Sequence, residues 1–117
     1  MFELNEHSDI KFLEINSICD FLNENFCKQI TNQMLAEKFH YHPYYLNRIF
    51  KEKIGVTIHR YIIECRITEA KRRLTEEDTP ISVIAVECGF ATISYFSRQF
   101  KSYVGVSPSE YKKLSIN

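Results

Sequence analysis

Four polar residues recur along a short stretch of the chain at spacings of three and four, and their side chains are of kinds that can contact a nucleic acid. Arginine can donate two parallel hydrogen bonds to guanine, asparagine can pair with adenine, and tyrosine can pack on a thymine methyl group or donate to a phosphate. Lysine more often contacts phosphate. Spacings of three and four put side chains on one face of a helix. The four residues are Tyr44, Asn47, Arg48 and Lys51.

The apolar residues between them complete the pattern of a surface helix. Leu46, Ile49 and Phe50 fall on the opposite side and are expected to face a core. A proline at the first helical position and Gly55 after the last turn mark the two ends. The stretch therefore predicts a helix over about residues 43–53 with one polar face left free.

A second stretch, fifty residues later, repeats this pattern. The paired residues are Tyr45 and Tyr95, Arg48 and Arg98, Phe50 and Phe100, Lys51 and Lys101, and Gly55 and Gly105. Upstream the best shift becomes forty-nine, which predicts one extra residue in the central turn of the second copy. Internal repetition predicts two similar units. Units of about 50 residues are marginal alone, so the copies are expected to support each other.

The polar face of the second copy is chemically simpler than that of the first. Small hydroxyl groups read bases tolerantly, and isoleucine offers only an apolar contact such as one with a thymine methyl group. We therefore expect the second face to contribute more positioning than discrimination, with its arginine as the exception. The residues of this face, including two at its N-terminal tip, are Thr92, Ile93, Ser94, Ser97, Arg98 and Lys101.

The composition favours an all-helical protein whose charge is unevenly distributed. Only three Gly and three Pro among 117 residues leave little room for many turns. The formal net charge is zero, yet residues 43–73 hold eight basic and three acidic groups, and residues 91–117 hold four and one. A basic face can bind a polyanion while the whole molecule stays neutral. Ordinary solvated helix faces are the alternative explanation.

Capping signals divide the rest of the chain into helices. Ser8 or Asp9 can cap an opening helix, Thr31 a short second one, and Thr79 a later helix with Pro80 as its first residue. The sequence SPSE, residues 107–110, is a capping box for a last helix. Each copy is thus a short helix, a turn and a longer helix, the helix-turn-helix plan. A connector of roughly 20 residues spans about 30 Å, close to the 34 Å or so between successive major-groove faces.

Two long stretches closely resemble the AraC/XylS family of bacterial transcription regulators. They are PISVIAVECGF followed by SYFSRQFKSYVGVSPSEYKK, and YYLNRIFKEKIGVTIHRYIIECRITEAKRRL. The resemblance implies a seven-helix domain that binds an asymmetric DNA site through two major grooves, with Tyr44, Asn47 and Arg48 at base-facing positions. His42 stands where the family often has a capping serine, and Ile93 where it is more often polar. These departures bear on base preference.

The expected architecture is an all-α domain of about seven helices, with two helix-turn-helix subdomains joined by a long connector helix. We expect an N-terminal extension over residues 1–9, the DNA-binding domain over 10–113 and a tail over 114–117. Within the domain, the first unit covers about 10–56, the connector 57–77 and the second unit 78–113.

The expected function is sequence-specific binding of double-stranded DNA in bacterial transcription regulation. The family's commoner mode is activation, which makes RNA polymerase a second expected partner, and a separate effector-binding or dimerisation domain can lie outside this chain. The alternative is a helix-turn-helix-derived module that binds protein and no longer binds DNA specifically. Retention of Asn47, Arg48, Arg98 and both lysines on the two polar faces favours DNA.

Other classes of function find little support. No run of about 18 apolar residues and no secretory leader is visible, so we expect a cytoplasmic protein. The four cysteines lack a CxxC pair, which favours free thiols. The spacing of His40, His42, His59 and Cys65 suits neither a metal site nor a nucleophile, so we expect no enzyme activity, metal or cofactor.

Two questions about charged residues stay open at this stage. Arg48 and Arg98 can either contact DNA or form ion pairs inside the protein, with Glu64, Glu69 and Glu87 as available partners. The run of basic residues 71–73 can be a solvated helix end or a clamp for phosphate.

Overall fold

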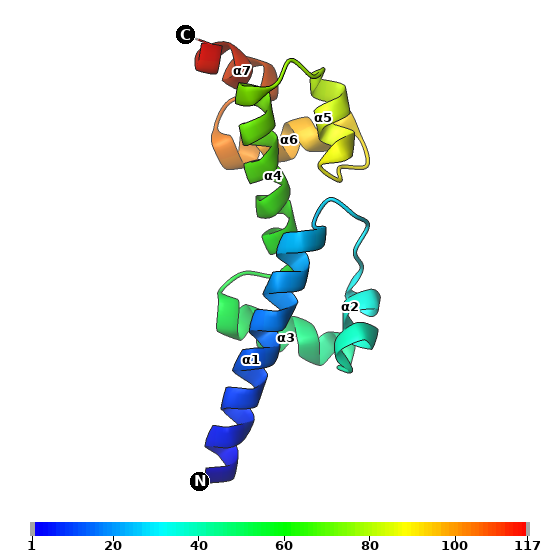
Figure 1. Ribbon diagram of the computed structural model, residues 1–117, viewed down its shortest axis with the longest axis vertical. Helices are drawn as coiled ribbons and strands as arrows, with labels where there is room; N and C mark the ends of the chain where they lie inside the picture. Colours follow the sequence, from blue (N-terminus) through cyan, green and yellow to red (C-terminus); the bar gives the residue numbers. More distant parts are fainter. Residues whose placement is uncertain (1, 117) are drawn as a thin grey trace. The chain divides into compact units, whose positions relative to one another are not determined.

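The computed structural model describes the backbone of residues 2–116 and the side chains of residues 13–115. Over that range the chain forms seven helices and no strand, which confirms the all-α prediction (Figure 1). None of these helices is both long and apolar enough to cross a membrane. The helices are α1 (Phe2–Asn25), α2 (Asn32–Phe39), α3 (Pro43–Ile54), α4 (Ile58–Glu76), α5 (Ile81–Glu87), α6 (Ile93–Val104) and α7 (Pro108–Ile116).

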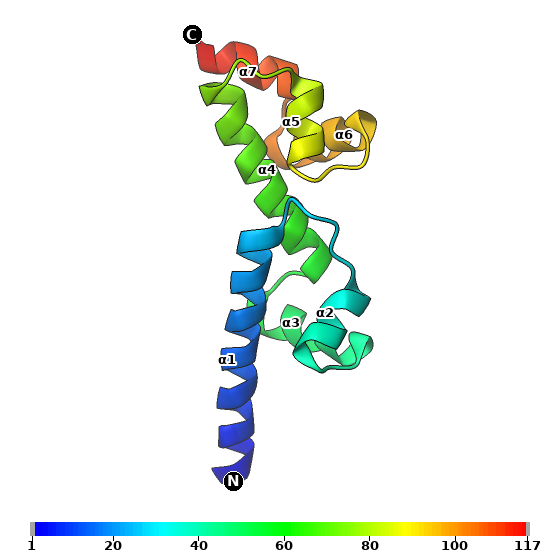
Figure 2. The same cartoon turned by 45° about the vertical axis from the view of Figure 1, so that its right-hand side comes forward.

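The chain divides into two compact units. The first contains α1, α2, α3 and the start of α4 through Tyr61, and the second contains residues 26–29 together with the chain from Ile62 onward. In each unit a short helix and a longer helix pack together across a short turn (Figure 2). The segment 26–29, which connects α1 to α2 along the chain, packs as part of the second unit.

The predicted repeat is present in the helix boundaries. The second unit's short helix α5 begins forty-nine residues after α2, whereas α6 begins fifty residues after α3. This difference confirms the extra residue predicted in the second turn. Both longer helices end at a glycine with nearly the same left-handed conformation, φ 95° at Gly55 and φ 95° at Gly105.

Local capping explains most helix starts. The Thr31 hydroxyl accepts a hydrogen bond from the Met34 amide at 3.1 Å, and the Ser107 hydroxyl accepts one from the Glu110 amide at 3.2 Å. These bonds satisfy amide groups that have no partner within the helix. The predicted caps at Thr31 and Ser107 are therefore confirmed.

Two predicted helix starts are wrong. Helix α1 begins at Phe2, so Ser8 and Asp9 lie inside it and do not cap it. Helix α5 begins at Ile81 with Pro80 in the cap position, one residue later than predicted. The Thr79 hydroxyl instead donates a hydrogen bond to the Glu77 carboxylate at 2.9 Å, because that carboxylate offers a stronger acceptor beside it.

The first unit buries one apolar stripe from each helix. On α1, Ile15, Ile18 and Leu22 recur at spacings of three and four and are buried. Phe50 of α3 meets the ring of Tyr61 edge to face at 5.6 Å between centroids. The Tyr61 hydroxyl in turn donates to the side-chain oxygen of Asn23 at 2.8 Å, so this half-buried tyrosine satisfies its polar end.

The second unit has a continuous core. The stripe predicted on the connector is buried and packs against α5 and α6. Aromatic rings extend this core, with centroid distances of 5.0 Å between Phe90 and Phe96, 5.6 Å between Phe96 and Phe100, and 5.5 Å between Phe100 and Tyr111. The residues of the predicted stripe are Ile63, Ile67, Ala70 and Leu74.

Candidate nucleic-acid interface

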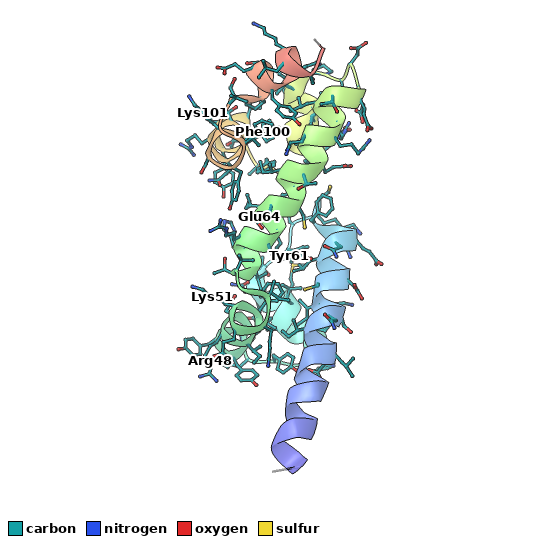
Figure 3. All side chains as sticks on the ribbon, turned by 90° about the vertical axis from the view of Figure 1, so that its left-hand side faces the viewer. Arg48, Lys51, Tyr61, Glu64, Phe100 and Lys101 are labelled. Carbon is teal, nitrogen blue, oxygen red and sulfur yellow. The ribbon has the colours of Figure 1, made fainter. Side chains whose placement is uncertain are left out.

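The polar face predicted on α3 lies at the protein surface. Tyr44 is 73% exposed, and Arg48 and Lys51 are also exposed, whereas Asn47 is half-buried. Figure 3 shows Arg48 and Lys51 projecting from the outer side of α3. The opposite side of the helix is anchored in the first unit's core by Leu46, Ile49 and Phe50. The helix is thus held by its apolar side and presents its polar side to solvent.

Arg48 has two weak contacts within the first unit. Its Nε lies 3.9 Å from Oε1 of Glu52, and both side chains are 58% exposed. Its guanidinium also lies 5.6 Å from the centroid of the Tyr45 ring. An exposed ion pair at this distance contributes little to stability. Its carboxylate partner is therefore Glu52 rather than any of the three glutamates considered from sequence, and the guanidinium can leave it at little cost.

The side chain of Asn47 is partly engaged by its own helix. Its amide nitrogen donates to the backbone oxygen of Pro43 at 3.1 Å. An amide nitrogen carries two hydrogens, and the side-chain oxygen is a separate acceptor. One N–H and the oxygen of Asn47 therefore stay available for an outside partner.

The equivalent face of α6 is also exposed. Thr92, Ile93, Ser94, Arg98 and Lys101 are exposed, and Ser97 is half-buried. Figure 3 shows Lys101 directed away from α4, whereas Phe100 points inward. Arg98 forms no ion pair or hydrogen bond with any side chain in the described range 13–115. The position that corresponds to Glu52 is Ser102, so no carboxylate stands one turn beyond Arg98.

The N-terminal tips of the two helices are capped by different chemistry. At α6 the Thr92 hydroxyl accepts from the Tyr95 amide at 3.0 Å. At α3 the Nδ1 of His42 accepts from the Tyr44 amide at 3.2 Å, which confirms that this histidine replaces the usual capping side chain.

The basic run at the end of α4 is largely engaged inside the second unit. Arg72 pairs with Glu69 at 2.7 Å and with Glu76 at 2.6 Å. Arg73, 15% exposed, pairs with Glu77 at 3.0 Å and with Glu87 at 2.7 Å. The hydrogen bonds that these arginines donate to the carboxylates raise the pKa of both arginines above the ordinary value.

This ion-pair network gives Arg72 and Arg73 a role that neither interpretation of the basic run had included. Arg72 and Arg73 are held by carboxylates of their own unit, so a structural role is favoured over a phosphate clamp. Glu87, which was considered from the sequence as a partner for Arg48 and Arg98, pairs with Arg73 instead. Lys71 differs from its neighbours in its partner, which is an aromatic ring: its ammonium lies 5.9 Å from the centroid of Tyr111.

Sequence reasoning missed Arg66, the most buried charged residue of the described chain. It is 9% exposed, its Nε donates to the Phe26 carbonyl at 2.6 Å, and its Nη2 donates to the Lys28 carbonyl at 3.0 Å. Burial lowers the pKa of Arg66. A signal for it existed, because position 66 lies three residues after Ile63 and four before Ala70, inside the apolar stripe.

Three of the four cysteines, Cys19, Cys27 and Cys88, show no sign of activation. Cys88 is fully buried, and this burial raises the pKa of its thiol to about 11. Burial also raises the pKa values of Cys19 and Cys27. Since the thiolate is the nucleophilic form, these thiols stay protonated and poorly reactive near neutral pH.

Comparison with known proteins gives a consistent match. The family described as "Helix-turn-helix domain" matches residues 35–114. The multiple antibiotic resistance protein MarA of Escherichia coli is 30% identical over 104 residues, which are 89% of this chain and 82% of MarA. The HTH-type transcriptional regulator YisR of Bacillus subtilis is 37% identical over 94 residues, 80% of this chain and 33% of YisR. The chain thus spans about a third of the length of YisR.

A solved structure agrees with these relatives. The C-terminal domain of AraT, a response regulator from Geobacillus stearothermophilus, superposes with a TM-score of 0.83 at 28% sequence identity. The match covers 86% of this chain and 84% of that domain. Likeness of this extent confirms the two-unit helical fold and the resemblance found in the sequence.

Proposed function

The chain belongs to the AraC-type helix-turn-helix family of transcription regulators, and from this membership we propose that it binds double-stranded DNA sequence-specifically. In this proposal α3 and α6 enter adjacent major grooves of one asymmetric site. The observation that carries it is the pair Arg48 and Arg98, which stand at equivalent exposed positions on two helices whose opposite sides are buried. Two copies of one reading surface in one chain need no second subunit to contact two grooves.

In the first copy, base discrimination falls mainly to Arg48 and Asn47. Arg48 would leave the weak contact with Glu52 and donate to the O6 and N7 of a guanine. Asn47 retains the oxygen and the N–H that pairing with adenine requires. Tyr44 would pack on a thymine methyl group or donate to a phosphate, and Lys51 would contact a phosphate.

In the second copy, one arginine would carry most of the discrimination. Arg98 has no described partner to leave and can extend directly toward a base edge. Thr92, Ser94 and Ser97 would make tolerant hydroxyl contacts, and Ile93 an apolar one. Lys101 would contact a phosphate, as Lys51 does in the first copy.

At the level of the whole protein, the proposal is a transcription regulator that acts in the bacterial cytoplasm. The DNA-binding part would cover about residues 10–113, with the first unit at 10–56, a connector at 57–77 and the second unit at 78–113. Activation through contact with RNA polymerase is the mode we propose, and an effector-binding or dimerisation domain would belong to a longer chain. This part rests on the family, which is one of transcription regulators.

The test starts from random duplexes, selected by binding and then sequenced. The best site is titrated at several salt concentrations with wild type, Arg48→Ala and Arg98→Ala. We expect a site of two blocks about 10 base pairs apart and a negative slope of log affinity against log salt. Each substitution should cost about 1–3 kcal/mol and relax the preference in one block.

Arg72→Ala is the matched control, because Arg72 is also an exposed arginine, but one that Glu69 and Glu76 already hold. It should leave the preference in both blocks unchanged. If selection enriches no motif, and the weak binding is unchanged by Arg48→Ala and by Arg98→Ala, the DNA proposal fails. A protein-interaction module would then be the better description.

A further inference from the structure

Three segments of the second unit meet at the side chain of Arg66. The residue itself belongs to α4, and its guanidinium donates to the carbonyls of Phe26 and Lys28 in the segment 26–29. On its other side the guanidinium lies 5.9 Å from the centroid of the Phe90 ring, in the turn between α5 and α6. One planar cation therefore holds two loops that are separated by about sixty residues of sequence.

The turn approaches this cation as closely as a backbone can. Gly89 has φ +108°, and a Cβ on it would lie 2.7 Å from Nε and 2.9 Å from Cζ of Arg66. The same Cβ would lie 2.9 Å from the backbone oxygen of Cys27. No other residue fits there without displacing its neighbours. The buried residues on either side, Cys88 and Phe90, fix the turn further.

The position of this turn determines how α6 begins. Only Ala91 separates Phe90 from the cap residue Thr92. The Phe90 ring packs against Phe96 at 5.0 Å and Tyr95 at 6.1 Å between centroids, both within the first turn of α6. A shift of the turn would therefore rotate or translate the N-terminal part of α6, which carries the exposed Ile93 and Ser94.

An arginine suits this place better than an apolar residue or a lysine would. A buried cation is costly unless hydrogen bonds compensate it, and here two carbonyls and an aromatic ring do so. The guanidinium presents its donors in a rigid planar fork, whereas a lysine offers a point charge on a flexible stem. The arginine therefore fixes directions as well as distances between the two loops.

The first copy provides an internal comparison. The corresponding turn, residues 40–42, is exposed at His40 and His42. No buried cation holds α3 in this way among the described residues.

We propose that Arg66 is a positioning residue for α6, the second reading head. Arg66 sets the orientation of the proposed DNA-contacting face of α6 without itself touching DNA. This inference rests on the proposed function, because it assigns α6 to base recognition. It predicts that loss of Arg66 affects one block of the DNA site and spares the other. A residue that served only overall stability would affect both blocks alike.

The experiment compares Arg66→Met and Arg66→Lys with wild type in the full chain. Each protein is titrated against the selected two-block site, a site with the first block scrambled and a site with the second block scrambled. We expect both variants to keep the wild-type penalty for scrambling the first block within about twofold. The penalty for scrambling the second block should fall by about tenfold or more, the size expected when a protein no longer reads one base pair.

Ile67→Val is the matched control for stability, since it trims a buried neighbour on α4 whose side chain has no hydrogen-bonding group. A second readout needs no DNA: hydrogen exchange of the Tyr95 amide, which donates to the Thr92 cap. The exchange rate of this amide should rise by about tenfold or more in Arg66→Met and change little in Ile67→Val. Arg66→Lys serves for both readouts if the methionine variant does not fold.

The outcomes separate the two proposals. If wild type selects no two-block site, the proposed function fails, and the exchange measurement still decides whether Arg66 orders the start of α6. If wild type selects such a site and the Arg66 variants weaken both blocks equally, the positioning role is wrong. The same holds if Tyr95 exchanges no faster in the Arg66 variants than in Ile67→Val.

Discussion

His40 and Gly89 occupy equivalent places in the two helix-turn-helix units, forty-nine residues apart, and each leaves the right-handed region after a short helix. His40 has φ 61° and is exposed, whereas Gly89 has φ 108° and is buried. Histidine tolerates the first conformation at modest cost, but the second is nearly reserved for glycine. The two units thus turn at equivalent positions, one on the surface and one packed against a buried cation.

The short helices are also anchored by different interactions. In the first unit α2 packs on α1 through the rings of Phe21 and Phe39, 6.2 Å apart and edge to face, with the Lys38 ammonium 4.9 Å from the Phe21 centroid. In the second unit α5 is tied to α4 by the ion pair of Arg73 and Glu87. The repeat has kept the helix geometry while the interactions that hold it have diverged. Four pairs of substitutions test how far this divergence goes.

The largest effect is expected at Gly89. Gly89→Ala places a methyl group against Arg66 and the Cys27 carbonyl and also forces alanine to a positive φ. We expect a loss of about 3 kcal/mol or more in the free energy of unfolding, from strain and displaced packing together. Thermal or urea unfolding followed by circular dichroism measures it.

Gly105→Ala is the matched control for that substitution. Gly105 has φ +95°, yet nothing lies within 4 Å of the added methyl group. It should cost about 1–2 kcal/mol from the backbone alone. Equal losses at both glycines would mean that the contact with Arg66 contributes nothing, and the contrast between the two turns would be wrong in its main point.

The next effect concerns the caps of the two reading helices. Thr92→Ala removes the hydroxyl that accepts from the Tyr95 amide and should cost about 1 kcal/mol. His42→Ala removes the corresponding acceptor at α3 and should cost less, because its bond at 3.2 Å is longer and reaches only the second amide. Unfolding curves of both variants give the comparison. A larger loss at His42 would show that the first unit depends on its cap more than the geometry indicates.

Acid should weaken the second unit's ion pairs as their carboxylates take up protons. Hydrogen bonds from Arg73 and Thr79 lower the pKa of Glu77 below its ordinary value of 4.5. The contribution of Glu77 to stability is therefore present above the ordinary pKa and is lost as pH falls through the lower folded value. We expect the difference in melting temperature between wild type and Glu77→Gln to shrink from pH 7 to pH 3.

Glu37→Gln is the control for the acid experiment. Glu37 of α2 accepts from the Gln33 amide at 2.9 Å, a neutral partner without an ion pair. Its substitution should change the melting temperature by a similar small amount at each pH. If the difference in melting temperature between wild type and Glu77→Gln stays constant down to pH 3, the ion pairs of Glu77 are not an acid-sensitive contribution to stability.

Much of this fold could be predicted because its signals are local. Helix periodicity, prolines at helix starts and glycines after helix ends act within a few residues, and the repeat doubled each signal. The predicted start of α1 was wrong because Ser8 and Asp9 are residue types that often cap helices, yet α1 begins at Phe2 and continues through them. A possible cap does not by itself stop a helix that can continue upstream.

The site was predicted in part for the same reason. Which side chains of α3 and α6 are exposed follows from spacing, whereas their base contacts stay predictions. Arg66 could not be assigned, because its hydrogen-bond partners lie 40 and 38 residues away in sequence. The partner of Arg48 was also missed, since Glu52 at the fourth position along its own helix was nearer than the glutamates considered.

Glu52 and Ser102 offer the finest test of the difference between the two reading heads. In the proposed complex Glu52 would compete with DNA for Arg48 and place a carboxylate near the phosphates, whereas Ser102 would leave Arg98 unopposed. Glu52→Ser should therefore tighten binding about two- to fivefold, the size of an exposed ion pair, and Ser102→Glu should weaken it by a similar factor. Both changes should diminish as salt rises, because they are electrostatic and exposed. Titration of the two-block site at low and high salt measures them.

If Glu52→Ser instead weakens binding and relaxes the preference in the first block, Glu52 aims Arg48 at its base rather than restraining it. The first head would then be ordered by a surface carboxylate and the second by a buried arginine.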